Sequence, residues 1–113
     1  MSVSEGYAYL SDEEILKPKA ERKVMENAQG YIKMVFDELR RAEAKFPGFP
    51  IDPIHAAAVL AEESGELQKA CLQWTYEGGE YSQVLEEAIQ TAAMAFRFLI
   101  NMEKMEPRKS EQA

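Results

Sequence analysis

Two clusters of proline and glycine divide the chain, and this division constrains its fold more than any other feature. The first cluster is Pro47–Pro50, with the sequence PGFP, and the second is Gly78-Gly79. Proline lacks a backbone N–H and glycine accepts left-handed backbone angles, so both residues interrupt helices. Outside these breaks, apolar residues recur at steps of three and four, whereas no stretch shows the alternation typical of a strand. The sequence therefore predicts an all-α fold built from three long helices.

The first helix is predicted to run from Pro18 to about Lys45. Proline suits a first helical turn because its missing N–H would have no partner there. The apolar face of this segment consists of Val24, Ala28, Tyr31, Val35, Leu39, Ala42 and Phe46. This stripe is typical of an amphipathic helix, which would be about 40 Å long at 1.5 Å per residue.

The second helix is predicted to run from Pro53 to Trp74 or Tyr76. Asp52 precedes it and can cap the free N–H groups of the first turn, while a following proline fits the first helical position. Gly78-Gly79 lies just beyond the other end, where glycine adopts the left-handed conformation that stops a helix.

The third helix is predicted from near Ser82 to about Met105. Its apolar face consists of Leu85, Ile89, Ala92, Phe96 and Leu99. Because short loops join the three helices, we expect an antiparallel helical bundle. Three helices form a thin core for so much apolar surface, so we expect oligomerisation to complete the bundle, as a homodimer or a homotetramer.

Three parts are expected along the chain: a polar lead-in at residues 1–17, the helical bundle domain at residues 18–106, and a flexible tail at residues 107–113. Within the lead-in, Ser11–Glu14 has the form of a capping box and predicts a short helix. A chain of 113 residues has room for one hydrophobic core, so the bundle is the single folded domain.

The net charge of −7 belongs almost entirely to one segment. Residues 51–103 carry nine acids, and their bases are Lys69 and Arg97 alone. An acidic chain of this kind is poorly suited to a nucleic-acid polymer or to an anionic membrane surface. No apolar run approaches the roughly 20 residues that cross a bilayer, so we expect neither a nucleic acid nor a membrane as partner.

The location of the protein is predicted from its first residues and its cysteine content. Met1–Leu10 contains no basic region followed by an apolar stretch, so we expect no secretory signal. Cys71 is the only cysteine, which excludes an intramolecular disulfide. Both features favour the reducing cytoplasm.

The acidic segment contains two pairs of polar side chains at helical spacing. Glu63 and Glu66 are three residues apart, as are Glu87 and Gln90, so each pair shares a helix face. The 20 residues between Glu66 and Glu87 suffice to end one helix, turn and begin the next, which would bring the pairs face to face. Mg²⁺ prefers such oxygen ligands and could hold a phosphate there for hydrolysis. The alternative is that both pairs lie on ordinary solvent-exposed helix faces and bind no metal.

The two strings that carry this pattern resemble a known family. Leu60–Leu67 (LAEESGEL) and Leu85–Gln90 (LEEAIQ) are similar to the motifs of the MazG-type all-α nucleoside triphosphate pyrophosphohydrolases. Their signature is a Glu-x-x-Glu pair, a spacer of about this length and a Glu-x-x-Asp pair. The resemblance covers roughly residues 20–103 and implies a helical bundle that assembles as a dimer or a tetramer.

The resemblance implies an enzyme that depends on Mg²⁺, with Mn²⁺ as a possible substitute. Such an enzyme cleaves a nucleoside triphosphate between the α and β phosphates and releases the monophosphate and pyrophosphate, a house-cleaning type of reaction. By the same match, Glu63, Glu66 and Glu87 are the catalytic residues and the metal ligands.

Gln90 departs from the family pattern, which has aspartate at this position. An amide oxygen can bind a hard cation, but it adds no charge and cannot act as a base. The site could therefore bind metal weakly, recruit Glu62 or Glu86 as a further ligand, or be catalytically inactive.

Three residues are candidates for substrate binding, and each has a structural alternative. Arg97 could clamp a phosphate or form an ion pair with Glu63 or Glu87. Lys69 could also bind phosphate, or it could be an ordinary solvated lysine. Trp74 could stack on a nucleobase, or it could cover the end of the bundle or an interface.

Two hypotheses compete with the enzyme. One is a degenerate family member that binds nucleotide or metal without turnover. The other is an oligomeric helical interaction module, in which the acidic groove docks a basic partner.

Overall fold

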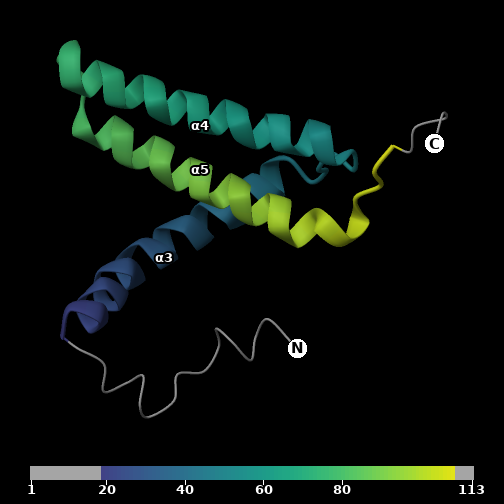
Figure 1. Ribbon diagram of the computed structural model, residues 1–113, viewed down its shortest axis with the longest axis horizontal. Helices are drawn as coiled ribbons and strands as arrows, with labels where there is room; N and C mark the ends of the chain where they lie inside the picture. The colour runs from purple at the N-terminus through teal and green to yellow at the C-terminus, as the bar shows by residue number, and fades with distance from the viewer. Residues whose placement is uncertain (1–18, 109–113) are drawn as a thin grey trace. The chain divides into compact units, whose positions relative to one another are not determined.

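The computed structural model describes residues 19–108, and all regular structure within them is helical (Figure 1). The elements are α3 (Lys19–Lys45), α4 (Pro53–Tyr76), α5 (Tyr81–Asn101) and the short 3-10 helix η1 (Met102–Lys104). The prediction of an all-α fold with three long helices is confirmed for this part of the chain. Pro18, the capping box Ser11–Glu14 and most of the predicted tail lie outside the described residues. None of the described helices combines the length and the apolar character needed to span a membrane.

Both ends of α4 follow from local sequence. At the start, the Asp52 carboxylate accepts a hydrogen bond from the N–H of Ile54 at 3.3 Å, which caps the first turn. At the other end, Gly78 adopts a φ of 69° and the N–H of Gly79 donates to the Gln73 carbonyl at 2.8 Å. A Cβ at Gly79 would lie 2.9 Å from the backbone of Gln73, so only glycine fits this turn. The predicted bounds of this helix are confirmed.

The third helix ends earlier than the sequence pattern predicts. The α-helix stops at Asn101, and a 3-10 turn follows it instead of an α-helix that continues to Met105. The side-chain amide of Asn101 donates to the Arg97 carbonyl at 2.7 Å, and the N–H of Met102 bonds to the Leu99 carbonyl three residues back. This tighter spacing ends the α-helix because i to i+3 bonds replace the i to i+4 ladder.

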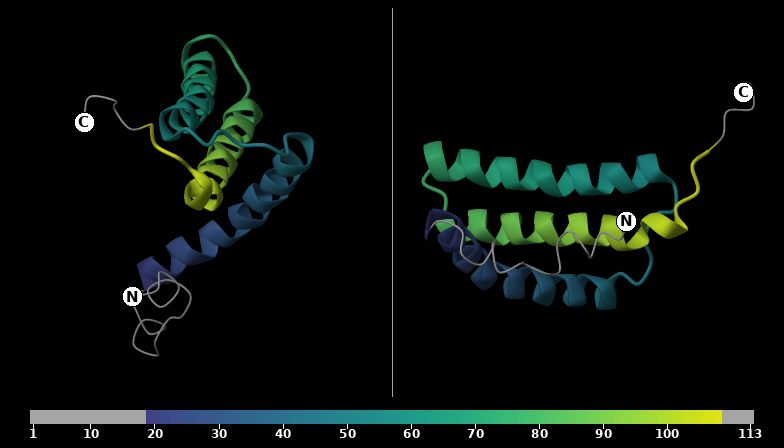
Figure 2. Two further views of the ribbon diagram at one scale, coloured as in Figure 1. Left: turned by 90° about the vertical axis from the view of Figure 1, so that its right-hand side faces the viewer. Right: turned by 60° about the horizontal axis from the view of Figure 1, so that its bottom comes forward.

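The chain forms two compact units, residues 1–32 and residues 33–113. In the second unit, α4 and α5 lie side by side and run in opposite directions (Figure 1), and both views of Figure 2 keep them adjacent. The part of α3 in this unit contacts α5, where the rings of Phe36 and Phe96 meet edge to face at 5.5 Å. The turn between Tyr76 and Tyr81 thus brings the two polar pairs of the sequence onto neighbouring helices.

The buried core of the described residues is small and rich in alanine. Its apolar members are Val35, Ala42, Ala56, Ala70 and Ala93. Alanine at these positions allows close approach of the helices, but it removes little apolar surface from water. Many larger apolar side chains remain exposed, including Leu99 and Ile100, each of which is more than half exposed. The helices of a single chain therefore leave much of their apolar surface uncovered.

Candidate functional site

Glu63 lies half-buried on α4, and together with the four glutamates whose charge acts on it, it forms a cluster, the carboxylate group. Burial raises the pKa of Glu63 because it removes water from the charged form. Negative charge from four neighbours raises this pKa further; in decreasing order of effect they are Glu87, Glu66, Glu62 and Glu38. The group draws on α3, α4 and α5, so it depends on the fold of the second unit as a whole.

A hydrogen bond joins the backbones that carry the two polar pairs. The Thr91 hydroxyl lies 2.8 Å from the Glu87 carbonyl oxygen, four residues back on α5, and 3.1 Å from the Glu63 carbonyl oxygen on α4. Its single hydrogen is shared between two acceptors. This contact keeps the Glu63 turn of α4 beside the Glu87 turn of α5, although the sequence analysis did not single out Thr91.

The remaining predicted ligands differ in their surroundings. Glu62 and Glu66 are exposed on α4. Glu87 is half-buried and accepts a hydrogen bond from the side-chain amide of Gln83 at 3.1 Å. Gln90 is half-buried as well, and its amide lies 3.5 Å from a Glu86 carboxylate oxygen, which is a long contact.

The donor chemistry of this group suits a hard divalent cation, but its side chains do not converge on one point. Within residues 19–108, no three His, Cys, Asp or Glu side chains are close enough together to hold a metal ion. Carboxylate oxygens are the ligands that Mg²⁺ prefers. A bound cation would also reduce the repulsion between Glu63 and the neighbouring carboxylates. Binding would therefore require the exposed side chains of Glu62 and Glu66 to rotate toward Glu63.

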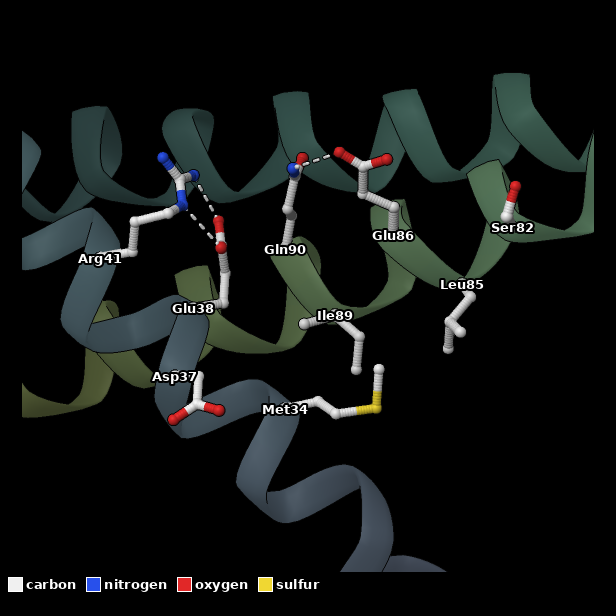
Figure 3. A pocket seen from close by; sticks show the side chains of 9 residues that line it. All are labelled: Met34, Asp37, Glu38, Arg41, Ser82, Leu85, Glu86, Ile89 and Gln90. Atoms are coloured by element: carbon white, nitrogen blue, oxygen red, sulfur yellow. Dashed lines mark hydrogen bonds and ion pairs between the residues drawn. The ribbon is translucent and has the colours of Figure 1, made fainter.

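A hollow of about 620 Å³ lies between α3 and α5, next to this group. Its lining consists of Met34, Asp37, Glu38, Arg41, Ser82, Leu85, Glu86, Ile89 and Gln90 (Figure 3). A smaller recess of about 100 Å³ contains Glu63 and is lined by three of the same residues: Glu38, Arg41 and Gln90. The carboxylate group and the larger hollow are thus neighbouring parts of one surface.

Arg41 lines both hollows, and the sequence analysis did not single it out as a candidate. Its guanidinium makes two parallel contacts with the Glu38 carboxylate, at 2.8 Å and 2.6 Å. The Arg41 hydrogen bond lowers the pKa of Glu38, because it stabilises the charged carboxylate. The sequence places Arg41 in the last turns of a helix, but it gives no sign that α5 lies opposite.

Arg97 is buried and holds the loop between α3 and α4 in place. Only 3% of the residue is exposed, and its Nε lies 3.2 Å from a carboxylate oxygen of Glu43. Another guanidinium nitrogen donates to the carbonyls of Phe46 and Gly48, at 2.5 Å and 3.2 Å. The carbonyl groups of this loop lie outside a helix and have no helical N–H partner, so Arg97 donates the hydrogen bonds that they accept.

This arrangement corrects the ion pair that the sequence suggested for Arg97. The partner is Glu43 of α3, and neither Glu63 nor Glu87 contacts the guanidinium. The reason is the long-range packing of α3 on α5, which the spacing of residues within α5 does not reveal. Because its nitrogens serve Glu43 and the loop, we leave Arg97 out of the substrate-binding residues proposed below.

The other two substrate-binding candidates lie away from both hollows. Lys69 is exposed on α4 and lines neither hollow. Trp74 is half exposed and packs edge to face on Tyr81 at 5.4 Å, beside the turn between α4 and α5. It lies eight residues beyond Glu66, or about 12 Å along the helix axis. The described structure therefore does not bring Trp74 to the carboxylates.

Comparison with family models found none that matches, and comparisons with curated proteins and with solved structures found no significant match. The likeness to MazG-type enzymes rests on the two motifs alone. Any function for this chain must be argued from the carboxylate group and the hollow beside it.

Proposed function

We propose that this protein is a Mg²⁺-dependent nucleoside triphosphate pyrophosphohydrolase, with Mn²⁺ as a possible substitute. The observation that carries the proposal is the placement of half-buried Glu63 beside the Glu87 turn, through the Thr91 hydroxyl, where burial and neighbouring carboxylates raise the pKa of Glu63. A divalent cation would relieve that repulsion and would bring a polyphosphate to the group. Electrostatic strain of this kind clusters at functional sites, although structural networks also produce it.

Glu63, Glu66 and Glu87 are the proposed metal ligands, and Gln90 or Glu62 completes the set. When bound, Mg²⁺ polarises phosphate oxygens and lowers the pKa of a coordinated water. The reaction would add water across the bond between the α and β phosphates. The water oxygen would join the α phosphorus, and pyrophosphate would leave with the bridging oxygen. The motif resemblance is the basis for this choice of bond.

We also propose that a second copy of the chain completes an antiparallel bundle, as a homodimer or a homotetramer. The proposal is supported by exposed apolar side chains on the second unit: Phe36, Phe96, Leu99, Ile100 and Met102. Apolar side chains that a single chain leaves exposed can be covered by a second copy. Chemical cross-linking and sedimentation would measure the assembly directly.

A member that binds nucleotide without turnover is the second candidate. Two observations favour it: Gln90 replaces a charged ligand of the motif, and no three acidic side chains within residues 19–108 converge on a point. Titration calorimetry would show nucleotide binding for this candidate while all activity assays stayed blank. An interaction module that docks a basic partner would bind neither metal nor nucleotide, and Mg²⁺ would not change its melting temperature.

The test of the proposed enzyme is a screen of purified protein against canonical and modified nucleoside triphosphates. Each nucleotide is incubated with Mg²⁺, with Mn²⁺ and with a chelator, and pyrophosphate is measured. We expect pyrophosphate from at least one nucleotide in the presence of metal and none with the chelator. Release at the same rate in the chelator, or no release from any nucleotide, would overturn the proposal.

A further inference from the structure

We propose that the hollow between α3 and α5 binds the nucleoside part of the substrate, and that Arg41 positions its phosphates. This inference rests on the proposed function and specifies the substrate as a nucleotide with a base and sugar, as opposed to a bare polyphosphate. The phosphate contact is thereby assigned to a residue of α3. The sequence had instead suggested three substrate-binding residues on the other two helices: Arg97, Lys69 and Trp74.

Most of the polar residues that line the hollow lie in one row, and its apolar residues lie on the other side. Figure 3 shows Arg41, Glu38, Gln90 and Glu86 in that row, whereas Met34, Leu85 and Ile89 lie away from it, with the carboxylate of Asp37 beside Met34. Its volume of about 620 Å³ falls within the usual range for small-molecule sites. An apolar wall with a polar row beside it can cover a flat base while the phosphates lie on the polar side.

Arg41 is placed where the hollow meets the carboxylate group. It lines the larger hollow, and with Glu38 and Gln90 it also lines the recess that contains Glu63. Arg97 is the other base in the linings of these two hollows, and it is buried against Glu43 and the loop carbonyls. A phosphate that enters from the hollow toward Glu63 therefore meets one available cation on its way.

The present contacts of Arg41 indicate how it would receive a phosphate. Glu38 occupies the guanidinium with two parallel hydrogen bonds on the surface of α3, where 53% of the Arg41 side chain is exposed. Phosphate oxygens offer the same paired geometry as a carboxylate, so they can replace Glu38 at the same two donors. Glu38 thus competes with the ligand, and its charge opposes phosphate binding.

Arg40 provides a matched control for this role. It lies next to Arg41 on α3, it is exposed, and it pairs with an acid three residues earlier, Asp37, which also accepts a hydrogen bond from Lys33 and lines the larger hollow. Arg40 lines neither hollow. A general loss of positive charge on α3 would affect both variants equally, whereas a phosphate contact belongs to Arg41 alone.

The experiment measures binding of α,β-methylene nucleoside triphosphates with Mg²⁺ by titration calorimetry, because these analogues resist the proposed cleavage. We expect Arg41→Gln to weaken binding about tenfold or more, and Arg40→Gln to change it less than about twofold. Glu38→Gln should strengthen binding about threefold, because it frees the guanidinium and removes a competing charge. Opposite signs for the two partners would not arise if the Arg41–Glu38 pair only stabilised the helix. Arg41→Lys, which keeps the charge, should recover part of the affinity.

A second probe, inorganic tripolyphosphate with Mg²⁺, tests the nucleoside half of the hollow. Met34→Ala should weaken binding of the nucleotide analogue about threefold and leave tripolyphosphate binding unchanged. Equal binding of the two probes by the wild-type protein, or equal effects of Arg41→Gln and Arg40→Gln, would overturn the inference. Pyrophosphate release would then still support the proposed function. Conversely, if the expected binding pattern were observed without hydrolysis, the proposed enzymatic activity would be wrong. The hollow between α3 and α5 would still be the nucleotide-binding site.

Discussion

The side-chain hydroxyl of Thr91 on α5 lies 3.1 Å from the backbone carbonyl oxygen of Glu63 on α4. This contact spans 28 positions of the sequence and occurs where the two polar pairs adjoin. Helices that pack through small side chains can slide along each other, because alanine offers few interlocking contacts. A polar contact at this position therefore fixes which turn of α5 faces Glu63, and with it the spacing of the carboxylates.

Thr91→Val removes this hydroxyl while the shape of the side chain stays nearly the same. We expect the free energy of unfolding to fall by about 1 kcal/mol, since the side-chain hydrogen bond from α5 to α4 is lost. Thr75→Val is the matched control, because the Thr75 hydroxyl bonds to the Cys71 carbonyl within α4 at 2.7 Å and bridges no other helix. Urea unfolding measures both variants. Equal losses would show that the contact between α4 and α5 does not contribute to stability.

Glu63→Gln should stabilise the metal-free protein at neutral pH. Burial and four neighbouring carboxylates raise the pKa of Glu63, so its charged form is unfavourable in the folded state. Removing like-charge repulsion of a few tenths of a kcal/mol should raise the melting temperature by about 1–3 °C. Thermal unfolding followed by circular dichroism measures the shift, with exposed Glu103→Gln as the control.

The pH dependence of this gain has a defined sign. The folded state holds the Glu63 proton more tightly than the unfolded state, so wild-type stability falls as pH rises from the ordinary glutamate value through the raised one. Below both values, the residue is protonated in either state and the variant gains nothing from lost repulsion. The advantage of Glu63→Gln should therefore be absent near about pH 3 and complete near about pH 8. An advantage of the same size at both ends would contradict the electrostatic explanation.

Gln90→Asp restores the charge that the family motif has at this position. An added carboxylate strengthens binding of hard cations, so we expect the dissociation constant for Mg²⁺ to fall about tenfold. Gln68→Asp is the matched control, since it adds the same charge at an exposed position of α4 outside both polar pairs. Titration calorimetry with Mg²⁺ measures both proteins. If the two substitutions have equal effects, only the overall charge has acted and Gln90 does not face the metal.

Arg97→Met tests the structural role that the fold gives to this arginine. The variant leaves Glu43 without its partner and the carbonyls of Phe46 and Gly48 without a donor. We expect a loss of about 2–3 kcal/mol in the free energy of unfolding, because Arg97 is almost fully buried. Arg40→Met, which breaks an exposed pair, should cost less than about 0.5 kcal/mol. Urea unfolding of the two variants would contradict this role if they were equally stable.

Local sequence signals predicted the helices because each boundary depends on neighbouring residues. Asp52 caps α4 through its own side chain, and Gly78 ends it through a conformation that other residues avoid. The end of α5 was less predictable, because the sequence on both sides of Asn101 keeps a helical pattern. The helix ends there with one side-chain hydrogen bond, from the Asn101 amide to the Arg97 carbonyl. Both boundaries of α4 were therefore predicted well, and the end of α5 was not.

The site was predictable only where it depends on one helical hairpin. Helical spacing and the length of the connecting segment suggested that Glu63 and Glu87 would be near each other, and the charge of Glu87 does act on Glu63 in the structure. Glu38 and Arg41 come from α3, whose packing on α5 depends on contacts between residues about 50 positions apart, such as Arg97 with Glu43. Periodicity within one helix contains no information on such contacts.

Phosphorus NMR identifies the products of nucleotide hydrolysis and shows whether the reaction depends on Glu63. Wild-type protein is incubated with Mg²⁺ and the nucleoside triphosphate that performs best in the screen, beside Glu63→Gln and the control Glu103→Gln. We predict that the wild type and Glu103→Gln produce nucleoside monophosphate and pyrophosphate in equal amounts, and that Glu63→Gln is slower by about 100-fold or more. Orthophosphate with a nucleoside diphosphate as the products would exclude cleavage between the α and β phosphates, and full activity in Glu63→Gln would exclude Glu63 from the reaction.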